Sequence, residues 1–354
     1  MATLFCVRPA TRNIGNDLIN RATSDLIYSV FGPDTAIVNV PALKGAQYGG
    51  LTAAQVYDMN RLADGVVMGG GNLFENGQLT VDTQALAALH VPLMLVGMSH
   101  GRIYDAAHDL SERTDAMAPA TIRALAGKAC VVLVRDHGSQ RLLAELGADA
   151  EVGGCPSMFF PANPREQTAG ERVLLSIRHP ARMSVPPALQ WRVADDVRRL
   201  IAALETVYGK VVSLVCHDYR DIEFAKAFPD TPLLYFDDVD RYIAALRTCR
   251  LSVSYRLHAF LPCSAFGTPA IHLSYDERGA EMLATAGMAE WDIDLTATGD
   301  VVAAVLDRIA RIERYHELCR AARPAVAALA AVSLAALHRF RERVVQPAPA
   351  VFAC

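Results

Sequence analysis

The chain opens with a strand-like run, a helix-like run and a second strand-like run: Thr3-Leu-Phe-Cys-Val7, Asn16-Asp-Leu-Ile-Asn-Arg-Ala-Thr-Ser-Asp-Leu-Ile-Tyr-Ser-Val30 and Thr35-Ala-Ile-Val-Asn-Val40. This order is typical of a parallel strand pair, because parallel neighbours need a long crossover connection. The two outer runs are largely apolar, without strict alternation of polar residues. Such strands indicate a sheet that is covered by helices on both faces.

The same alternation continues along the chain. The further strand candidates are Gly65–Met68, Pro92–Gly97, Cys130–Val134, Arg172–Ile177, Lys210–Cys216, Leu233–Phe236, Leu251–Ser254 and Ala270–Leu273. The helical stretches between them include Thr52–Ala63, Gly138–Leu146, Pro187–Tyr208 and Val239–Arg247. The pattern from Asp300 to Val345 is helical, and Pro324 predicts a break in it.

A polar segment with two prolines, Pro161–Gly170, is the best candidate for a linker. It divides the 354 residues into two halves with about five strands each. We therefore predict an α/β protein of two Rossmann-like, doubly wound domains, residues 1–160 and 171–354, with a cleft between them. In such sheets ligands bind beyond the carboxyl ends of the strands, so the loops there are the places to search for function.

Composition excludes several classes of protein. Hydrophobic residues make up 52% and charged residues 20% of the chain, which is typical of a protein with a large core. The formal net charge of -4 gives no basic surface for nucleic acid. The eight cysteines form no CxxC pair, and neither a metal site nor a disulfide framework is predicted. The longest apolar segment, Pro324 to Leu337, is shorter than the about 20 residues of a membrane span, so we expect no integral membrane segment and a cytoplasmic location.

Two strand ends in the first half carry candidate binding residues. After the first strand, Asn13 and Gly15 could receive an anion on exposed amides, although this motif alone favours an ordinary helix cap. The third strand runs into Gly69-Gly70-Gly71-Asn72, where the missing Cβ atoms would let a ligand or another backbone approach. Because Phe74 takes the place of a third glycine, this is not a dinucleotide fingerprint.

Arg135 ends the fifth strand candidate and precedes Asp136, which is placed to cap the next helix. Arg135 then faces the cleft, bridges the two domains or forms a structural ion pair with its neighbour. The sequence leaves these alternatives open.

The second half carries the sharpest pattern, Ser254-Tyr255-Arg256-Leu257-His258, at the end of a strand candidate. Arginine offers a planar fork for carboxylate or phosphate, and histidine moves a proton near neutral pH. Arg278 follows the next strand and returns to the same rim. A single histidine beside an apolar run is more often structural. Arg256, His258 and Arg278 together, at successive strand ends, favour a site for an anionic substrate.

These motifs resemble the polysaccharide pyruvyl transferase family, whose members attach pyruvate ketals to bacterial and fungal glycans. The matching features, in chain order, are Asn13-Ile-Gly15, Gly69-Gly70-Gly71 with Leu73-Phe74, Val134-Arg135-Asp136, Arg178, His217-Asp218, Asp221, Ser254-x-Arg256-Leu257-His258, Gly267-x-Pro269 and Tyr275-Asp276. The match spans roughly residues 10–290, and its most specific part is the pair Arg256 and His258. Two departures are Gly15-Asn16-Asp17, where the family more often has Gly-Asp-Glu, and Arg278, where a lysine is common.

The resemblance implies a glycosyltransferase-B-like (GT-B-like) fold, phosphoenolpyruvate as donor substrate, a saccharide acceptor and no cofactor. It also implies that His258 is the catalytic acid and that Arg256, helped by Arg178 and Arg278, holds the donor. His217 either reads acceptor hydroxyls or packs beside Asp218. Whether the acceptor is lipid-linked or polymeric stays open. A lipid-linked acceptor would make this a peripheral protein of the inner membrane.

Two other functions fit the same architecture. A nucleotide-sugar glycosyltransferase would need acidic residues that hold a ribose. The nearest candidates, Glu277 and Glu281, are spaced as on the solvated face of a helix. A non-catalytic protein that binds a sugar or an anion is the second alternative, and the intact Arg256-Leu257-His258 motif argues against it.

Overall fold

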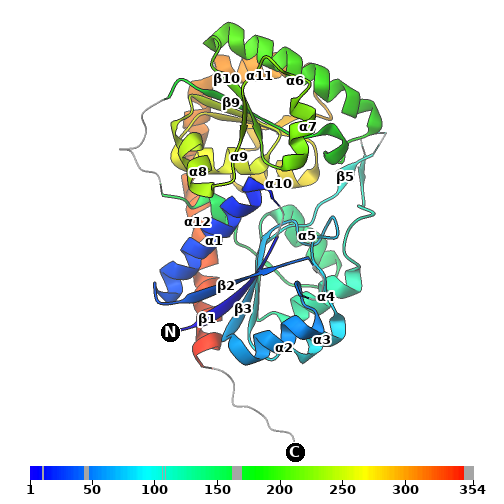
Figure 1. The fold of residues 1–354 in the computed structure, drawn as a ribbon, viewed down its shortest axis with the longest axis vertical. Helices are drawn as coiled ribbons and strands as arrows, with labels where there is room; N and C mark the ends of the chain where they lie inside the picture. The colour runs from blue at the N-terminus through cyan, green and yellow to red at the C-terminus, as the bar shows by residue number, and fades with distance from the viewer. Residues whose placement is uncertain (10–11, 44–47, 106, 108, 162–169, 347–354) are drawn as a thin grey trace, which may run out of the picture.

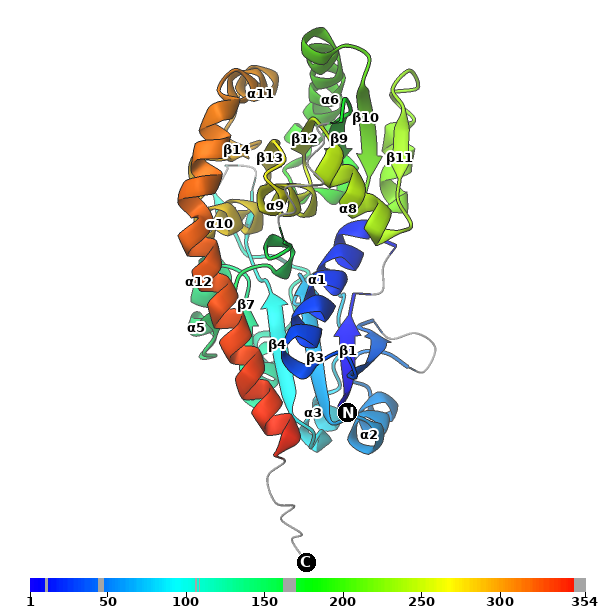
Figure 2. The ribbon, with the colours of Figure 1, turned by 90° about the vertical axis from the view of Figure 1, so that its left-hand side faces the viewer.

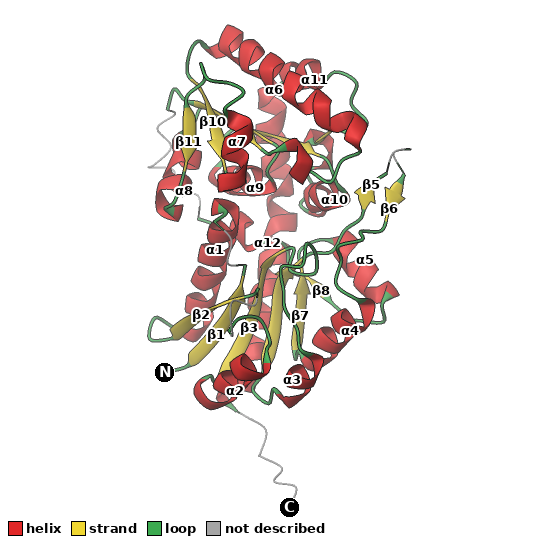
Figure 3. Cartoon of the chain, turned by 45° about the vertical axis from the view of Figure 1, so that its right-hand side comes forward, coloured by secondary structure: helices red, strands yellow, loops and turns green. Residues whose placement is uncertain are grey.

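The computed structural model describes residues 1–9, 12–43, 48–105, 107, 109–161 and 170–346. Residues 162–169 of the predicted linker lie outside this part of the chain. The chain forms two lobes, each built on a parallel sheet with helices on both faces (Figures 1 and 3). The predicted α/β class with two Rossmann-like halves is therefore confirmed.

The first sheet has the strand order β2-β1-β3-β4-β7-β8 and is parallel throughout. Its strands are β1 (Thr3–Arg8), β2 (Ala36–Pro41), β3 (Gly65–Gly71), β4 (Leu93–Met98), β7 (Val131–Val134) and β8 (Glu151–Val152). The helices of this lobe are α1 (Ile14–Phe31), α2 (Ala53–Leu62), α3 (Thr83–Ala88), α4 (Pro119–Lys128) and α5 (His137–Glu145). A small antiparallel pair, β5 (Ile103–Tyr104) and β6 (Leu110–Ser111), projects from it.

The second sheet has the order β11-β10-β9-β12-β13-β14 and is also parallel. Its strands are β9 (Val173–Ile177), β10 (Val212–Cys216), β11 (Leu233–Tyr235), β12 (Leu251–Ser254), β13 (Ala270–Ser274) and β14 (Ile293–Asp294). Its helices are α6 (Pro187–Tyr208), α7 (Ile222–Ala225), α8 (Val239–Thr248), α9 (Leu257–Phe266), α10 (Glu277–Thr285) and α11 (Val301–Ala310), and α12 (Ile312–Val345) follows them.

Both strand orders have a switch point, where the connections from two neighbouring strands leave in opposite directions and open a crevice. In the first sheet it lies between β1 and β3, and in the second between β9 and β12. The crevice forms because helices on opposite faces diverge from these two strand ends. The loops after β1, β3, β9 and β12 are therefore the places where this fold puts a ligand.

The triple glycine extends the predicted strand Gly65–Met68, because Gly69–Gly71 are the last residues of β3. A Cβ on Gly69 would lie 2.0 Å from the carbonyl oxygen of Val96 on β4. Gly70 and Gly71 have φ values of +91° and +104°, in the region that favours glycine. The glycines let the end of β3 lie close to its neighbours while it bends toward the cleft.

Helix α12 crosses from the second lobe to the first along one side of the molecule (Figure 2). Tyr315 and Leu318 are buried in the core that includes β9, β12 and β13, whereas Leu337 and Phe340 are buried against β1, β3 and β4. The predicted break at Pro324 is wrong, since the helix is continuous from Ile312 to Val345. Proline costs about 3 kcal/mol inside a helix, and packing of the turns on both sides outweighs that local cost.

By length and hydropathy alone, α12 could cross a membrane, and it is the one helix with this property in the described part of the chain. It is longer than the apolar segment that the sequence suggested, because the helix extends on both sides of Pro324. Its large side chains are divided between the two cores, as described above. We therefore interpret α12 as a strap that joins the lobes.

Replacing Phe340 tests this strap. Its side chain is fully buried and its ring lies 6.0 Å from that of Phe31 on α1. Phe340→Ala should lower the free energy of unfolding by about 3–5 kcal/mol, the usual effect of removing a buried phenyl ring, as measured by chemical denaturation. Arg341→Ala, at the exposed neighbouring position, is the control and should leave stability unchanged. Equal stability of both variants would show that α12 does not hold the lobes together.

Candidate active site

A small cavity of about 100 Å³ lies between the lobes, at the switch points of both sheets. Its walls are formed by Asn13, Asn16, Gly71, Asn72, Arg135, Arg178, His217, Tyr255, Arg256, Leu257, His258, His272, Ser274, Tyr275, Asp276, Arg278 and Gly279. We call it the arginine cavity. It shares Asn13, Asn16, Asn72, Arg178 and Arg256 with a second, polar cavity of about 610 Å³, which we call the amide cleft.

All but two of the predicted site residues border the arginine cavity. The exceptions are Gly15 and Gly70, whose missing side chains make room for other parts of the protein. A Cβ on Gly15 would lie 3.3 Å from both the Nδ1 of His217 and the Cβ of His258. A Cβ on Gly70 would meet Ile19 and Asn20 on α1. These two glycines make room for close packing around α1, and their contact with a ligand stays a prediction.

Two of the arginines lie at the switch point of the second sheet, Arg178 after β9 and Arg256 after β12. Arg256 is paired with the buried carboxylate of Asp221, and its Nε has no hydrogen-bond partner. Arg178 forms no ion pair with any described residue, its Nε also lacks a partner, and its guanidinium lies 5.8 Å from the ring centre of Tyr275. Burial and the neighbouring cations Arg256 and Arg278 lower the pKa of Arg178. Its charge is therefore the least compensated in the cavity.

Arg135, at the end of β7, lies on the opposite wall and contributes from the first lobe. Its Nε is 3.4 Å from the carboxylate of Asp136, and Asp136 caps α5 by accepting from the backbone N–H of Ser139 at 2.7 Å. Two of the three roles that the sequence left open for Arg135 are combined here, since it borders the cavity and belongs to a buried ion pair with Asp136.

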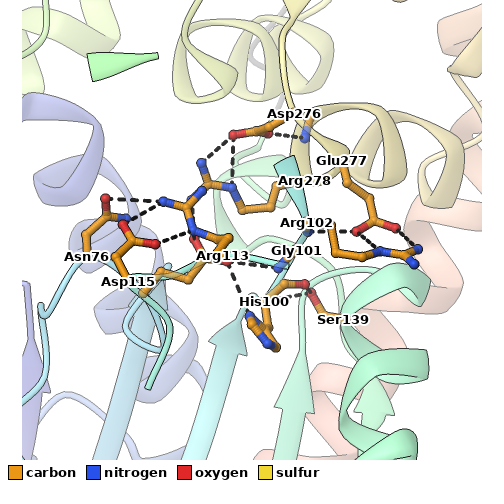
Figure 4. Close-up of polar contacts among 12 residues, drawn as sticks. Asn76, His100, Gly101, Arg102, Arg113, Asp115, Ser139, Asp276, Glu277 and Arg278 are labelled. Atoms are coloured by element: carbon orange, nitrogen blue, oxygen red, sulfur yellow. Dashed lines mark hydrogen bonds and ion pairs between the residues drawn. The ribbon is translucent and has the colours of Figure 1, made fainter. Parts of the chain in front are cut away.

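Arg278 is already occupied by carboxylates. It binds Asp276 at the start of its own helix and Glu75 from the loop after β3, so it links the two lobes. Glu75 is fully buried, lies 3.6 Å from the Nε of Arg113, and accepts a hydrogen bond of 2.8 Å from the N–H of Gly101. Figure 4 shows Arg278 and its surroundings. Burial alone would raise the pKa of Glu75, but Arg278, His100 and Arg113 outweigh it and hold that pKa below its usual value.

Glu277 does not lie on a solvated face as its spacing suggested. It is buried, and Arg102 of the first lobe donates to it from Nε at 3.1 Å and from a terminal nitrogen at 2.7 Å (Figure 4). Glu281, one turn further along α10, pairs with Arg141 at 2.6 Å. The start of α10 is therefore the part of the second lobe that reaches into the first, and its carboxylates serve the interface.

Three helices begin at the arginine cavity: α1 at Asn13, α9 at Arg256 and α10 at Asp276. The N-terminus of a helix carries a partial positive charge and free N–H groups, which favour an anion. Asn13 and Asp276 cap their helices with side-chain oxygens, whereas α9 has no side-chain cap. The helix that carries His258 thus leaves its first N–H groups available to a ligand.

His258 lies in the first turn of α9 and borders the cavity. Burial, followed by the charges of Arg135 and Arg256, lowers its pKa to about 3. Its Nε2 lies 3.8 Å from the Sγ of Cys155, while no described residue forms a hydrogen bond with its Nδ1. In the ligand-free protein His258 is therefore neutral at pH 7, with one ring nitrogen free.

His217 is held by Tyr242, whose hydroxyl lies 2.8 Å from its Nε2. Burial also lowers the pKa of His217 well below its usual value. The structure thus places His217 at the wall of the arginine cavity and in a packed pair with Tyr242, and a role in reading acceptor hydroxyls stays a prediction. Within the described residues, no three histidine, cysteine, aspartate or glutamate side chains are grouped to hold a metal ion.

The sequence reasoning did not name these wall residues as site residues: Asn16, Tyr255, Leu257, His272, Ser274, Tyr275, Asp276 and Gly279. Asn16, Tyr255, Leu257, Tyr275 and Asp276 stood within stretches that were quoted, so position in a motif was a usable signal. His272 was hidden in the apolar strand Ala270–Ser274, where Ala270, His272 and Ser274 alternate with Ile271 and Leu273. The strand period of two would have placed His272 on the same face as Ser274.

Comparisons with solved structures define the class of fold. A structure from Listeria monocytogenes, described as a candidate UDP-N-acetylglucosamine 2-epimerase, aligns with a TM-score of 0.60 and 14% identity over 98% of both chains. UDP-GlcNAc 2-epimerase from Neisseria meningitidis, bound to UDP-GlcNAc, aligns with a TM-score of 0.53 and 13% identity over 95% of this chain and 99% of that one. The chain therefore has the two-domain fold of the GT-B glycosyltransferases and epimerases. At this identity the likeness concerns the fold alone.

The sequence gives the family. The model of the polysaccharide pyruvyl transferase family matches residues 13–277, and the chain belongs to this family of transferases. No curated protein sequence matches the chain. The matched range begins at Asn13 and ends at Glu277, so it includes every wall residue of the arginine cavity except Arg278 and Gly279.

The pair of Glu75 and Arg278 can be tested by stability. Glu75→Gln leaves buried arginines without their full partner and should lower the free energy of unfolding by about 3–5 kcal/mol at pH 7. Because the folded pKa of Glu75 is below the unfolded value of about 4.3, its carboxylate stabilises the protein above that value and ceases to do so as the pH falls further. The difference in stability between Glu75→Gln and the wild type should therefore become smaller below about pH 4.3.

Glu223→Gln is the matched control, since Glu223 pairs with Lys226 at the surface and the same change should leave stability unaltered at every pH. Thermal unfolding of the three proteins between pH 3 and 8 measures both effects. A pH-independent loss in Glu75→Gln would show that the side chain acts by packing and not by charge.

Proposed function

We propose that this protein transfers the enolpyruvyl-derived group of phosphoenolpyruvate to two hydroxyls of a sugar, forming a pyruvate ketal and releasing phosphate. The observation that carries the proposal is the concentration of positive charge at one small cavity. Four arginines and three helix N-termini border about 100 Å³ of space that adjoins a larger polar cleft. A small ligand with two anionic groups suits such a site, because a carboxylate and a phosphate each accept several N–H bonds.

In this proposal, the donor is held by the arginines whose charge is least neutralised by neighbouring carboxylates. Arg178 has no acidic partner among the described residues, and the free Nε of Arg256 leaves part of its guanidinium available. Arg135 adds a charge from the first lobe, so the donor itself would draw the lobes together. Arg278 contributes to the local field and stays bound to Glu75 and Asp276. This differs from the role of direct helper that the sequence suggested for it.

His258 is the proposed acid that protonates the methylene carbon of the donor. The free Nδ1 is the atom to which we assign this proton. A pKa of about 3 in the ligand-free cavity is too low for an acid at pH 7, and its causes are burial and the arginines. A bound donor with several negative charges neutralises those arginines and raises the pKa of His258. Protonated His258 then exists mainly in the complex, which confines the chemistry to occupied sites.

The acceptor is proposed to occupy the amide cleft. Its volume of about 610 Å³ lies in the range typical of pockets for small ligands. The cleft is lined largely by amides and carboxylates, among them Asn72, Asn76, Gln78, Gln190 and Asp115. Such groups donate to and accept from sugar hydroxyls. A saccharide acceptor fits the description of the family, and a cytoplasmic enzyme that meets a lipid-linked acceptor at the inner membrane is one form of this proposal.

A nucleotide-sugar glycosyltransferase is less well supported. The acidic residues that could have held a ribose, Glu277 and Glu281, are engaged with Arg102 and Arg141. The neighbours that bind UDP-GlcNAc share the fold at 13% identity or so and carry no argument about this cavity. No cofactor or metal is needed by the proposal, since arginines supply the positive charge.

Two variants test the donor site. His258→Ala should reduce pyruvyl transfer by about 10²–10⁴-fold, the usual effect of losing a positioned acid, without loss of donor binding. Arg178→Met fills the same space without charge and should weaken phosphoenolpyruvate binding by about 10–100-fold, because hydrogen bonds to charged groups contribute about 1.5–3 kcal/mol. Calorimetry measures binding, and phosphate release with a panel of methyl hexopyranosides measures turnover.

The exposed His90 provides the matched control, and His90→Ala should behave like the wild type. Binding of phosphoenolpyruvate without turnover of any sugar in the wild type would favour the non-catalytic alternative. Turnover with a nucleotide sugar in place of phosphoenolpyruvate would establish the glycosyltransferase.

The proposed rise in the pKa of His258 predicts proton uptake. At pH 7 donor binding should take up more protons in the wild type than in His258→Asn, by up to one per site. Calorimetry in buffers of different ionisation enthalpy gives this number. Equal proton uptake by the two proteins would contradict the assignment of His258 as an acid that becomes charged in the complex.

A further inference from the structure

The proposed reaction needs both a proton donor and a proton acceptor. The scheme above assigns His258 as the donor and names no acceptor. A proton must reach the methylene carbon, and each of two hydroxyls must lose one as its oxygen binds carbon. A second imidazole, His272, lies in the wall of the same cavity and has no role in the scheme above.

The tautomer of His272 is fixed by its surroundings. His272 pairs with Ser254 across β13 and β12, and its Nδ1 lies 3.1 Å from the carbonyl oxygen of Ser254. A carbonyl oxygen only accepts, so Nδ1 carries the hydrogen of the neutral ring and Nε2 carries the lone pair. No described residue forms a hydrogen bond with Nε2. The ring is thus oriented by one nitrogen and carries its lone pair at the other, and burial lowers the pKa of His272 to about 4.

The space beside Nε2 is kept open by a glycine. A Cβ on Gly279, in the first turn of α10, would lie 3.1 Å from Nε2 and 3.1 Å from the Cβ of Ser274. Gly279 and Ser274 border the cavity together with His272. His217 is more crowded, because its Nε2 is bound by Tyr242 and a Cβ on Gly15 would lie 3.3 Å from its Nδ1. All three histidines in this wall keep one ring nitrogen free of hydrogen bonds from described residues, and that of His272 lies beside the space that Gly279 leaves open.

We propose that His272 is a second proton-transfer residue, which accepts the proton of the first attacking sugar hydroxyl at Nε2 and returns it to the departing phosphate. The proposal rests on the pyruvyl transfer described above and adds the base that this reaction needs. Two neutral imidazoles in one cationic cavity suit the task, since the ring that is protonated first discourages protonation of the other. His272 contributes in this way to the low pKa of His258, after burial, Arg135 and Arg256.

The proton balance closes with these two residues. Protonated His258 gives its proton to C3 of phosphoenolpyruvate as the first sugar oxygen binds C2, and the proton of that hydroxyl passes to Nε2 of His272. The bond between C2 and the phosphate oxygen then breaks, and His272 protonates the phosphate. The second sugar oxygen binds C2, and its proton returns to His258. The products are the ketal and hydrogen phosphate, and both histidines recover their starting states.

His272→Asn separates this role from a structural one. The amide nitrogen of asparagine takes the place of Nδ1 and keeps the hydrogen bond to Ser254, while nothing replaces Nε2. We expect unchanged thermal unfolding and unchanged binding of phosphoenolpyruvate, with kcat lowered by about 10²–10⁴-fold. Gly279→Ala is the second variant, because its methyl group occupies the space beside Nε2 and should also lower kcat with little change in donor binding.

The outcomes distinguish this proposal from the one it rests on. If the wild type releases phosphate with a methyl hexopyranoside and both variants keep wild-type kcat, His272 is structural and the pyruvyl transferase stands. If the wild type releases no phosphate with any sugar, the proposed function itself fails, and the role of His272 with it. A variant of His272 that loses donor binding and kcat to the same extent would also overturn the assignment.

Discussion

The carboxylate of Glu75 and the guanidinium of Arg278 meet at the boundary between the two lobes, nearly out of contact with water. A buried charge without its partner is strongly unfavourable, so this pair restricts how the lobes can be placed. The pair of Arg102 and Glu277 acts in the same region, and α12 packs on both cores from the side. With the lobes held in this way, the switch points of the two sheets face each other, and the arginine cavity exists only because they do.

The electrostatics of the cavity follow from that placement. Arginines from both lobes and the beginnings of three helices border it, and burial, followed by the charges of these arginines, lowers the pKa values of His217 and His258. The ligand-free site therefore holds a neutral His258 beside Arg178, which forms no ion pair with any described residue. Under the proposed function, an anionic donor would offset that charge and raise the pKa of His258, so donor binding and protonation would be coupled.

Much of the fold could be predicted because it depends on local patterns. The ten strand candidates correspond to strands of the two sheets within a few residues, from Thr3–Val7 to Ala270–Leu273. Continuous apolar runs between helices are easily recognised in a sequence. The errors have physical causes. Pro324 sits inside a helix because packing on two cores outweighs its local cost, and Gly69–Gly71 extend a strand because β4 and α1 lie too close for side chains.

The sequence alone determined the alternation of strands and helices, the family and the set of polar residues at the strand ends, because each of these depends on neighbours in the chain. Only the tertiary structure decided which of those residues act together. Glu277, expected on the surface, forms a buried ion pair with Arg102. Arg278 is bound to Glu75 of the other lobe. His272, in an apolar strand, borders the cavity with one ring nitrogen free of hydrogen bonds from described residues. These assignments depend on contacts between residues up to about 200 positions apart. No local pattern records them, because burial and pairing are properties of the assembled lobes.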